Sequence, residues 1–187
     1  ARHIECFTRR ALLTRKDMGL STAGGPESLK TLLAEPDFAL AFFLLSVLGE
    51  GSFLSLLWFL HANAPDAITR EVCRLAAQDE ARHVAFGLAH LRRHIGLDPG
   101  LRSRLAGAVA RRHDALRNTD GLNEEVFDAL VLLAAGSWEL SDLASGTDRV
   151  VALRQDMDRG RRLRLEKLGF PGDEAEALSA LHTKNFM

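Results

Sequence analysis

The sequence predicts an all-helical fold, a helical bundle that forms a single domain over residues 1–187. Apolar residues recur with helical spacing along most of the chain, and stretches of Val, Ile and Thr with two-residue alternation, which indicate strands, are missing. The 187 residues are enough for one sizeable hydrophobic core and few for two. No boundary is stronger than the loop GLDPG at 96–100, which precedes accessory helices at 101–187.

Turn residues and caps set the helix ends. LSTAGGPES at 20–28 ends the first helix, and Pro36 with Asp37 opens a long apolar helix. Pro65 interrupts that helix, and Asp66 is the expected N-cap of the next one. The expected helices are 1–18, a short one at 27–34, 37–61, 67–95, 101–117, 123–144, 147–168 and a short one after Gly172.

Charge and cysteine usage narrow the classes of partner. The 24 basic and 25 acidic residues give a net charge of −1, and no run of one sign indicates a nucleic-acid or polybasic membrane surface. Cys6 and Cys73 form no CxxC pair and no disulfide framework, and the N-terminus lacks the apolar core of a secretory signal. We therefore expect a cytoplasmic protein with a small-molecule partner.

The long apolar helix has one charge in 23 positions, residues 38–60, which is long enough to cross a bilayer. Against a membrane span, the charge is a carboxylate, Glu50, in the middle, and no basic flank sets an orientation. We expect the central helix of a bundle instead. A buried carboxylate must be neutralised, paired or bound to a metal, and Gly49 and Gly51 leave room beside Glu50.

The next helix supplies partners for Glu50. On a helical wheel, Asp79, Glu80 and His83 fall on the apolar face of 67–95, and His90 follows two turns later. Side chains at i and i+3 are neighbours, so Glu80 and His83 can hold one ion together.

Hairpin geometry brings Glu50 to the same level. Residues equidistant from the turn of an antiparallel helix pair lie side by side, and residue 65, inside the turn, is midway between Glu50 and Glu80. At about 1.5 Å per residue the group lies roughly 20 Å from the turn. The alternative is a buried ion pair, or two carboxylates that share a proton beside a core histidine, without a metal.

A Glu followed about thirty residues later by Glu-x-x-His on the antiparallel neighbour resembles half of the ferritin-like di-iron carboxylate pattern. DEARHVAFG at 79–87 is similar to members of that superfamily, and ARHIECF at 1–7 aligns with ARHVAFG at 81–87. The resemblance implies that His3 is equivalent to His83 and that two further Glu ligands precede Ala1, so that the chain is N-terminally incomplete. A His with no role near the chain start is the alternative for His3.

The same resemblance implies a supporting role for Asp79, the residue before the motif's Glu. In the family this Asp commonly accepts a hydrogen bond from a ligand His of the other half. A simple pair with a nearby arginine is the alternative.

Several branches of the superfamily do not fit. Ribonucleotide reductase small subunits need a radical tyrosine, and the sequence has none. Rubrerythrin-like peroxidases carry CxxC pairs, which are also missing. In N-oxygenases related to p-aminobenzoate oxygenase a further ligand His lies four residues before the second motif's Glu, where this sequence has Ala76.

The remaining resemblance implies a di-iron oxygenase or oxidase that uses dioxygen on a small organic substrate, with an unassigned electron donor. Two iron ions are expected, with manganese as the other possibility. The alternatives are an iron-oxidising or storage protein and a metal-free helical scaffold. Helices in 101–187 could cover the site or form a homodimer, and Glu139 could be an extra ligand or a surface residue. The expected pocket residues, for which core packing is the alternative, are Gly49, Gly51, Phe53, Gly87 and His90.

Overall fold

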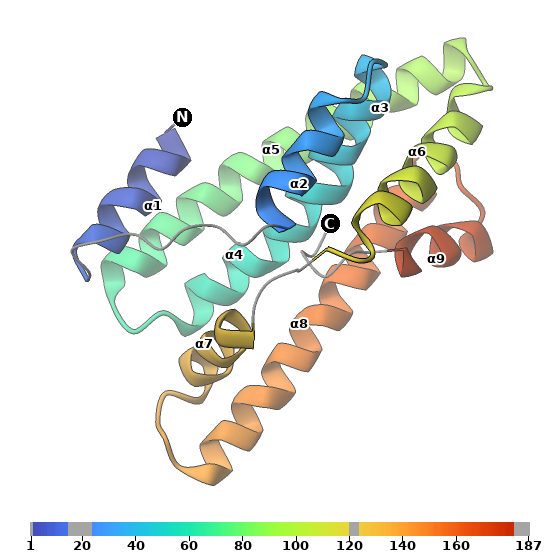
Figure 1. Cartoon of the computed structure of the whole chain (residues 1–187). Helices are drawn as coiled ribbons and strands as arrows, with labels where there is room; N and C mark the ends of the chain where they lie inside the picture. Colours follow the sequence, from blue (N-terminus) through green and yellow to red (C-terminus); the bar gives the residue numbers. More distant parts are fainter. Residues whose placement is uncertain (1, 15–23, 120–123, 182–187) are drawn as a thin grey trace.

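A computed structural model describes residues 2–14, 24–119 and 124–181, which form helices and their connections, with no strand in these ranges (Figure 1). The predicted all-helical class is confirmed. The elements are α1 (Arg2–Leu12), α2 (Gly24–Leu33), α3 (Phe38–Phe42), the π-helix η1 (Phe43–Glu50), α4 (Gly51–Asn63), α5 (Ala67–Leu97), α6 (Leu101–Leu116), α7 (Glu124–Ala135), α8 (Leu140–Lys167) and α9 (Gly172–Ala180).

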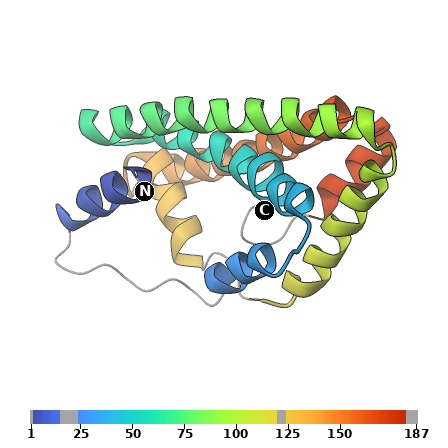
Figure 2. The ribbon, with the colours of Figure 1, turned by 90° about the horizontal axis from the view of Figure 1, so that it is seen from above.

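A helical hairpin forms the centre of the bundle. The elements α3, η1 and α4 follow one another as a continuous helical rod, which turns back at Pro65 so that α4 and η1 pack along α5 (Figure 2). Asp66 caps α5 as predicted, because its carboxylate accepts from the backbone N–H of Thr69 at 2.9 Å. On the other side of the rod α8 packs against α4, and α1 lies along α5.

The main hydrophobic core lies where η1 and α3 meet α5, α6, α8 and α9. Phe43, Leu91, Leu105 and Leu165 are fully buried there and come from four different helices. Burial of such side chains contributes about 1.5–3 kcal/mol each. Residues 43–49 of the rod are mostly buried, whereas most residues of α4 after Ser52 are only half-buried.

The rod Phe38–Asn63 is long and apolar enough to cross a membrane by length and composition. In the structure, 56% of its most apolar window is buried against the other helices. This packing is that of the core helix of a bundle.

Two expected boundaries in the second half are wrong. The helix expected over 123–144 ends at Ala135, and α8 begins at Leu140 rather than at 147. Gly136 has φ +75°, a left-handed conformation that ends α7 in the way glycine commonly ends helices. Glu139 is exposed immediately before α8, so it lies on the surface.

The first helix ends at Leu12, and the rest of its expected span, 15–18, lies outside the described residues. The short helices at α2 and α9 agree with the expected ones to within a few residues.

Candidate metal centre

Glu50 ends a π-helix in the apolar rod, at a half-buried position. In η1 the hydrogen bonds run from i to i+5, and π-helical turns are rare and frequently lie at functional sites. Glu50 is the last residue of this segment, and α4 continues directly from it. The sequence does not reveal η1, because residues 43–49 are apolar all round or small and show no change of period.

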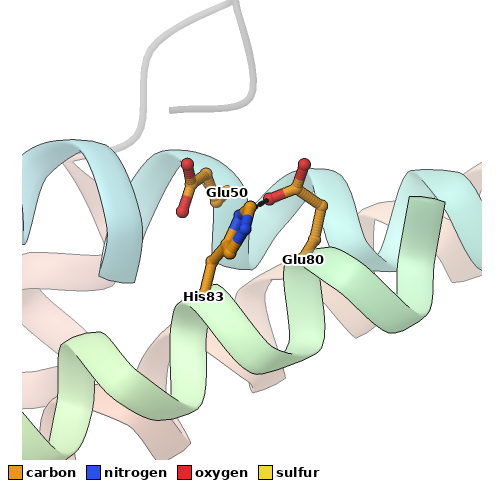
Figure 3. Close-up of side chains that lie close together, drawn as sticks. All are labelled: Glu50, Glu80 and His83. Carbon is orange, nitrogen blue, oxygen red and sulfur yellow. Dashed lines mark hydrogen bonds and ion pairs between the residues drawn. The ribbon is translucent and has the colours of Figure 1, made fainter. Parts of the chain in front are cut away.

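Three side chains with ligand atoms converge beside this turn. One ligand atom from each of Glu50, Glu80 and His83 lies within 4.8 Å of the others. Figure 3 shows that Glu50 projects from the rod while Glu80 and His83 project from α5 into the same space. The equal distance from the turn at residue 65 predicts this convergence, and the role of the three residues as ligands stays a prediction.

Glu80 and His83 also contact each other, as expected for positions i and i+3. His83 Nδ1 lies 2.9 Å from Glu80 Oε2. Only 14% of the Glu80 side chain is exposed, against 53% for His83. The group therefore lies at the edge of the bundle, with its carboxylate side inside.

His3 joins the same group from α1. Its Nδ1 lies 2.9 Å from Glu80 Oε1, and its Nε2 lies 3.0 Å from Asp79 Oδ2. The ring centroids of His3 and His83 are 6.4 Å apart, so the two imidazoles lie on the same side of α5. The structure thus brings together all four residues expected as ligands.

Asp79 makes both kinds of contact that the sequence left open. It hydrogen-bonds His3, and Arg2 and Arg82 form ion pairs with its two oxygens. These contacts hold the pKa of Asp79 below its ordinary value, first through the hydrogen bond with His3 and then through Arg2. Asp79 is therefore an ionised acceptor that fixes the ring of His3.

Glu50 has the opposite electrostatic environment. Burial raises its pKa, and the neighbouring carboxylate of Glu80 raises it further. A hydrogen bond with Ser46, and the imidazoles of His83 and His3, lower the pKa but do not cancel the increase. A partly buried carboxylate that faces another one is stabilised in its ionised form by a bound cation.

The donor set fits a divalent transition metal. Carboxylate oxygens and imidazole nitrogens suit iron, manganese and zinc. Ligand atoms about 2.1 Å from one ion are at most about 4.2 Å apart. A separation within 4.8 Å therefore needs only a small inward shift of these side chains.

Ser46 and Arg164 are site residues that the sequence reading missed. The hydroxyl of Ser46 donates to the carbonyl oxygen of His83 at 3.1 Å and so joins η1 to α5 at the centre. A serine one turn before Glu50 in an apolar run is a signal that could have identified it. Arg164 donates from Nε to the carbonyl oxygen of Val47 at 2.7 Å. No pattern in α8 distinguishes it from the other arginines of that helix.

The structure places the expected pocket residues mostly in packing contacts. A Cβ added to Gly51 would meet Arg164 Nε at 2.4 Å, and one added to Gly87 would meet Ser46 Oγ at 2.7 Å, so protein side chains fill the space beside both glycines. Gly49 is buried within η1, and the Phe53 side chain is 37% exposed. The ring of His90 packs among Phe42, Phe86 and His94.

A cavity of about 310 Å³ lies on the other side of His3, between α1 and α5. Its apolar wall consists of Phe7, Val72, Leu75 and Ala76, and its polar wall includes His3 and Asp79. The cavity therefore shares two residues with the cluster around Glu80.

The chain matches no protein-family model, and no similar curated protein or solved structure was found for it.

Proposed function

We propose that Glu50, Glu80, His83 and His3 are ligands of a two-metal carboxylate centre of the ferritin-like kind, and that the protein is a di-iron oxygenase or oxidase. The convergence of carboxylates and imidazoles from three helices at one level carries the proposal. Two iron ions, or manganese, bound there would supply activation of dioxygen for the oxidation of a small organic molecule.

The two carboxylates supply charge that a cation would neutralise. They come from facing helices, Glu50 from the end of η1 and Glu80 from α5, so one ion can be held between two rigid elements. Glu80 contacts His3 with one oxygen and His83 with the other, so it would hold metal together with either histidine.

Asp79 prepares His3 for metal binding. If the Nε2–H of His3 donates a hydrogen bond to Asp79, the lone pair of the neutral imidazole lies on Nδ1, which is directed at Glu80. This arrangement is the common one for ligand histidines, in which a carboxylate fixes the tautomer and the ring orientation.

The cavity beside His3 favours a small organic substrate. Its volume of about 310 Å³ lies at the lower end of the range for small-molecule pockets, and it combines an apolar wall with a few polar groups. A substrate bound there would contact the same histidine that touches Glu80.

One observation favours the metal-free alternative, a helical scaffold. The carboxylate of Glu80 is already hydrogen-bonded by His3 and His83, so the cluster is satisfied without an ion. In this reading the group is a buried polar network that joins α1 to the central hairpin.

Metal content by mass spectrometry separates the two readings. After purification without chelators, and with Fe²⁺ or Mn²⁺ supplied, we expect metal bound to the wild-type chain and lost in Glu80→Ala. The matched control is Glu71→Ala, which changes an exposed glutamate of the same helix that pairs with Arg74. If the wild-type chain binds no metal, the scaffold reading replaces the enzyme.

Oxygen consumption distinguishes an oxygenase from iron storage. An oxygenase or oxidase consumes dioxygen in proportion to an added organic substrate and reductant, at unchanged iron content. A storage protein consumes it only as further Fe²⁺ is added.

A further inference from the structure

A buried cation lies against the π-helix from the opposite side of the rod. Arg164, on α8, is only 8% exposed. Burial lowers its pKa to about 10, and the charge of Arg161 contributes in the same direction. Among the described residues no carboxylate forms an ion pair with Arg164, and its Nη2 is buried without a hydrogen-bond partner. A buried charge without a counter-ion destabilises the fold, so a contribution to stability does not explain an arginine at this position.

The hydrogen bond that Arg164 makes falls at an irregular point of the rod. In an α-helix the N–H of Gly51 would donate to the carbonyl of Val47. Here that N–H points to the carbonyls of Leu48 and Gly49, and the carbonyl of Val47 accepts from Arg164 Nε at 2.7 Å. The guanidinium therefore takes the place of a main-chain donor at the junction of η1 and α4.

Two glycines make this contact possible. A Cβ on Gly51 would stand 2.4 Å from Arg164 Nε and 2.5 Å from its Cζ. On α8 itself, a Cβ on Gly160 would stand 2.9 Å from Arg164 Nη1. Both residues lie in helices with ordinary dihedrals, so space for the guanidinium, rather than backbone freedom, explains why glycine is suited to these positions.

The turn that Arg164 contacts is the turn that carries Glu50. Val47 and Glu50 are three residues apart in η1, and Glu50 is its last residue. If the carbonyl of Val47 returned to a bond with Gly51, the wide π-helical turn would tighten to α-helical geometry and Glu50 would rotate about the rod. Arg164 contacts the carbonyl of Val47, so its influence on Glu50 would pass through the main chain.

We propose, on the basis of the metal centre proposed above, that Arg164 is a positioning residue of that centre. By holding the carbonyl of Val47, it keeps the π-helical turn in place and so directs Glu50 towards Glu80 and His83.

Replacement of Arg164 by methionine tests this role, because methionine keeps much of the volume and removes the donor and the charge. The lost hydrogen bond to Val47 and the relief of the buried charge have opposite effects on stability, so the melting temperature should change little. The affinity for Mn²⁺, measured by titration calorimetry, should nevertheless fall about 10- to 100-fold, as for other residues that orient metal ligands. Unchanged Mn²⁺ affinity would overturn the proposal.

Arg161→Met is the matched control. Arg161 is equally buried on the same helix, but its Nε donates to Ser179 of α9 and not to η1. Its replacement should leave Mn²⁺ affinity within about twofold of the wild type. A loss equal to that in Arg164→Met would show that any buried arginine of α8 has the same effect, and would overturn the specific role. Gly51→Ala displaces the guanidinium without altering Arg164, and serves with the same expectation where the methionine variant does not fold.

Amide hydrogen exchange in the metal-free protein separates this inference from the metal centre itself. In Arg164→Met the amides of residues 49–52 should exchange about tenfold faster, while those of α5 stay unchanged. If the wild type binds no Mn²⁺, the metal centre is contradicted, and exchange still decides whether Arg164 holds η1. If the exchange rates of residues 49–52 are the same in Arg164→Met and the wild type, Arg164 does not stabilise η1, whatever the metal content.

Discussion

The hydroxyl of Ser46 lies in the notch that Gly87 leaves on the surface of α5. A Cβ on residue 87 would stand 2.7 Å from Ser46 Oγ and 3.2 Å from Ser46 Cβ, and the same hydroxyl donates to the carbonyl of His83. The two helices that carry Glu50 and Glu80 are thus in close contact one turn away from the ligands. The separation of the carboxylates depends on this contact.

Gly87→Ala should force η1 away from α5. Overpacking of a buried contact costs about 1–3 kcal/mol, which exceeds the gain of about 0.5–1 kcal/mol for alanine over glycine in a helix. Urea denaturation should therefore show a net loss of stability. Gly96→Ala is the control, since a Cβ there meets nothing within 4 Å on the same helix. Stabilisation of both variants alike would contradict the close contact.

Glu50→Gln should stabilise the metal-free protein near neutral pH. The folded-state pKa of Glu50 is raised, first by burial and then by Glu80, so the folded state binds the proton more tightly than the unfolded chain. Stability linked to this group is present below the unfolded pKa of about 4.3 and is lost as the pH rises through the folded pKa. A neutral amide removes that loss, so the melting temperature at pH 7 should increase.

The same variant should lose metal binding, because an amide does not supply the charge of a carboxylate ligand. If Glu50→Gln raises the stability and lowers the metal affinity, Glu50 serves metal binding at a cost in stability. Thermal melting from pH 4 to pH 8 without metal, and titration with Mn²⁺, measure the two effects. If the melting temperature of Glu50→Gln at pH 7 falls below that of the wild type, Glu50 is part of a stabilising ion network instead.

Asp66→Ala should destabilise the protein by about 1 kcal/mol through loss of the α5 N-cap. The pKa of Asp66 lies well below its usual range, because Thr69 donates to it from both hydroxyl and backbone and Arg10 adds a further hydrogen bond. A depressed pKa means that the contribution is present above the unfolded value of about 3.9 and disappears as the pH falls through the folded value. The stability difference between wild type and variant, from urea denaturation, should shrink from pH 5 to pH 2. A difference that stays constant over this range would contradict the cap.

The proximity of Glu50 and Glu80 could be predicted from the sequence, because residues equidistant from the turn of an antiparallel helix pair lie side by side. A carboxylate in an apolar helix and a turn midway between two glutamates were enough, and no side-chain detail was required. The N-cap at Asp66 was predicted for a similar reason, since short-range hydrogen bonds depend on a few neighbouring residues.

The features that could not be predicted from the sequence depend on contacts between segments that are distant in the chain. The carbonyl of Val47 in η1 accepts a hydrogen bond from Arg164, 117 residues later in the chain, and no local sequence pattern encodes this contact. The boundary at Gly136 was missed because apolar residues continue on both sides of it, whereas the helix ends by a left-handed glycine. In both places the tertiary context overrides periodicity.

The Pro65 hairpin also sets an order of assembly. Glu50 and Glu80 are separated by a single short turn, whereas His3 meets Glu80 across 77 residues and Arg164 meets Val47 across 117. Contacts of low sequence separation form sooner, since less chain entropy is lost when the loop between them closes. We therefore expect the two carboxylates to be neighbours early in folding, while the histidine of α1 and the arginine of α8 arrive later. The nascent chain would then expose a pair of like charges until these late partners dock.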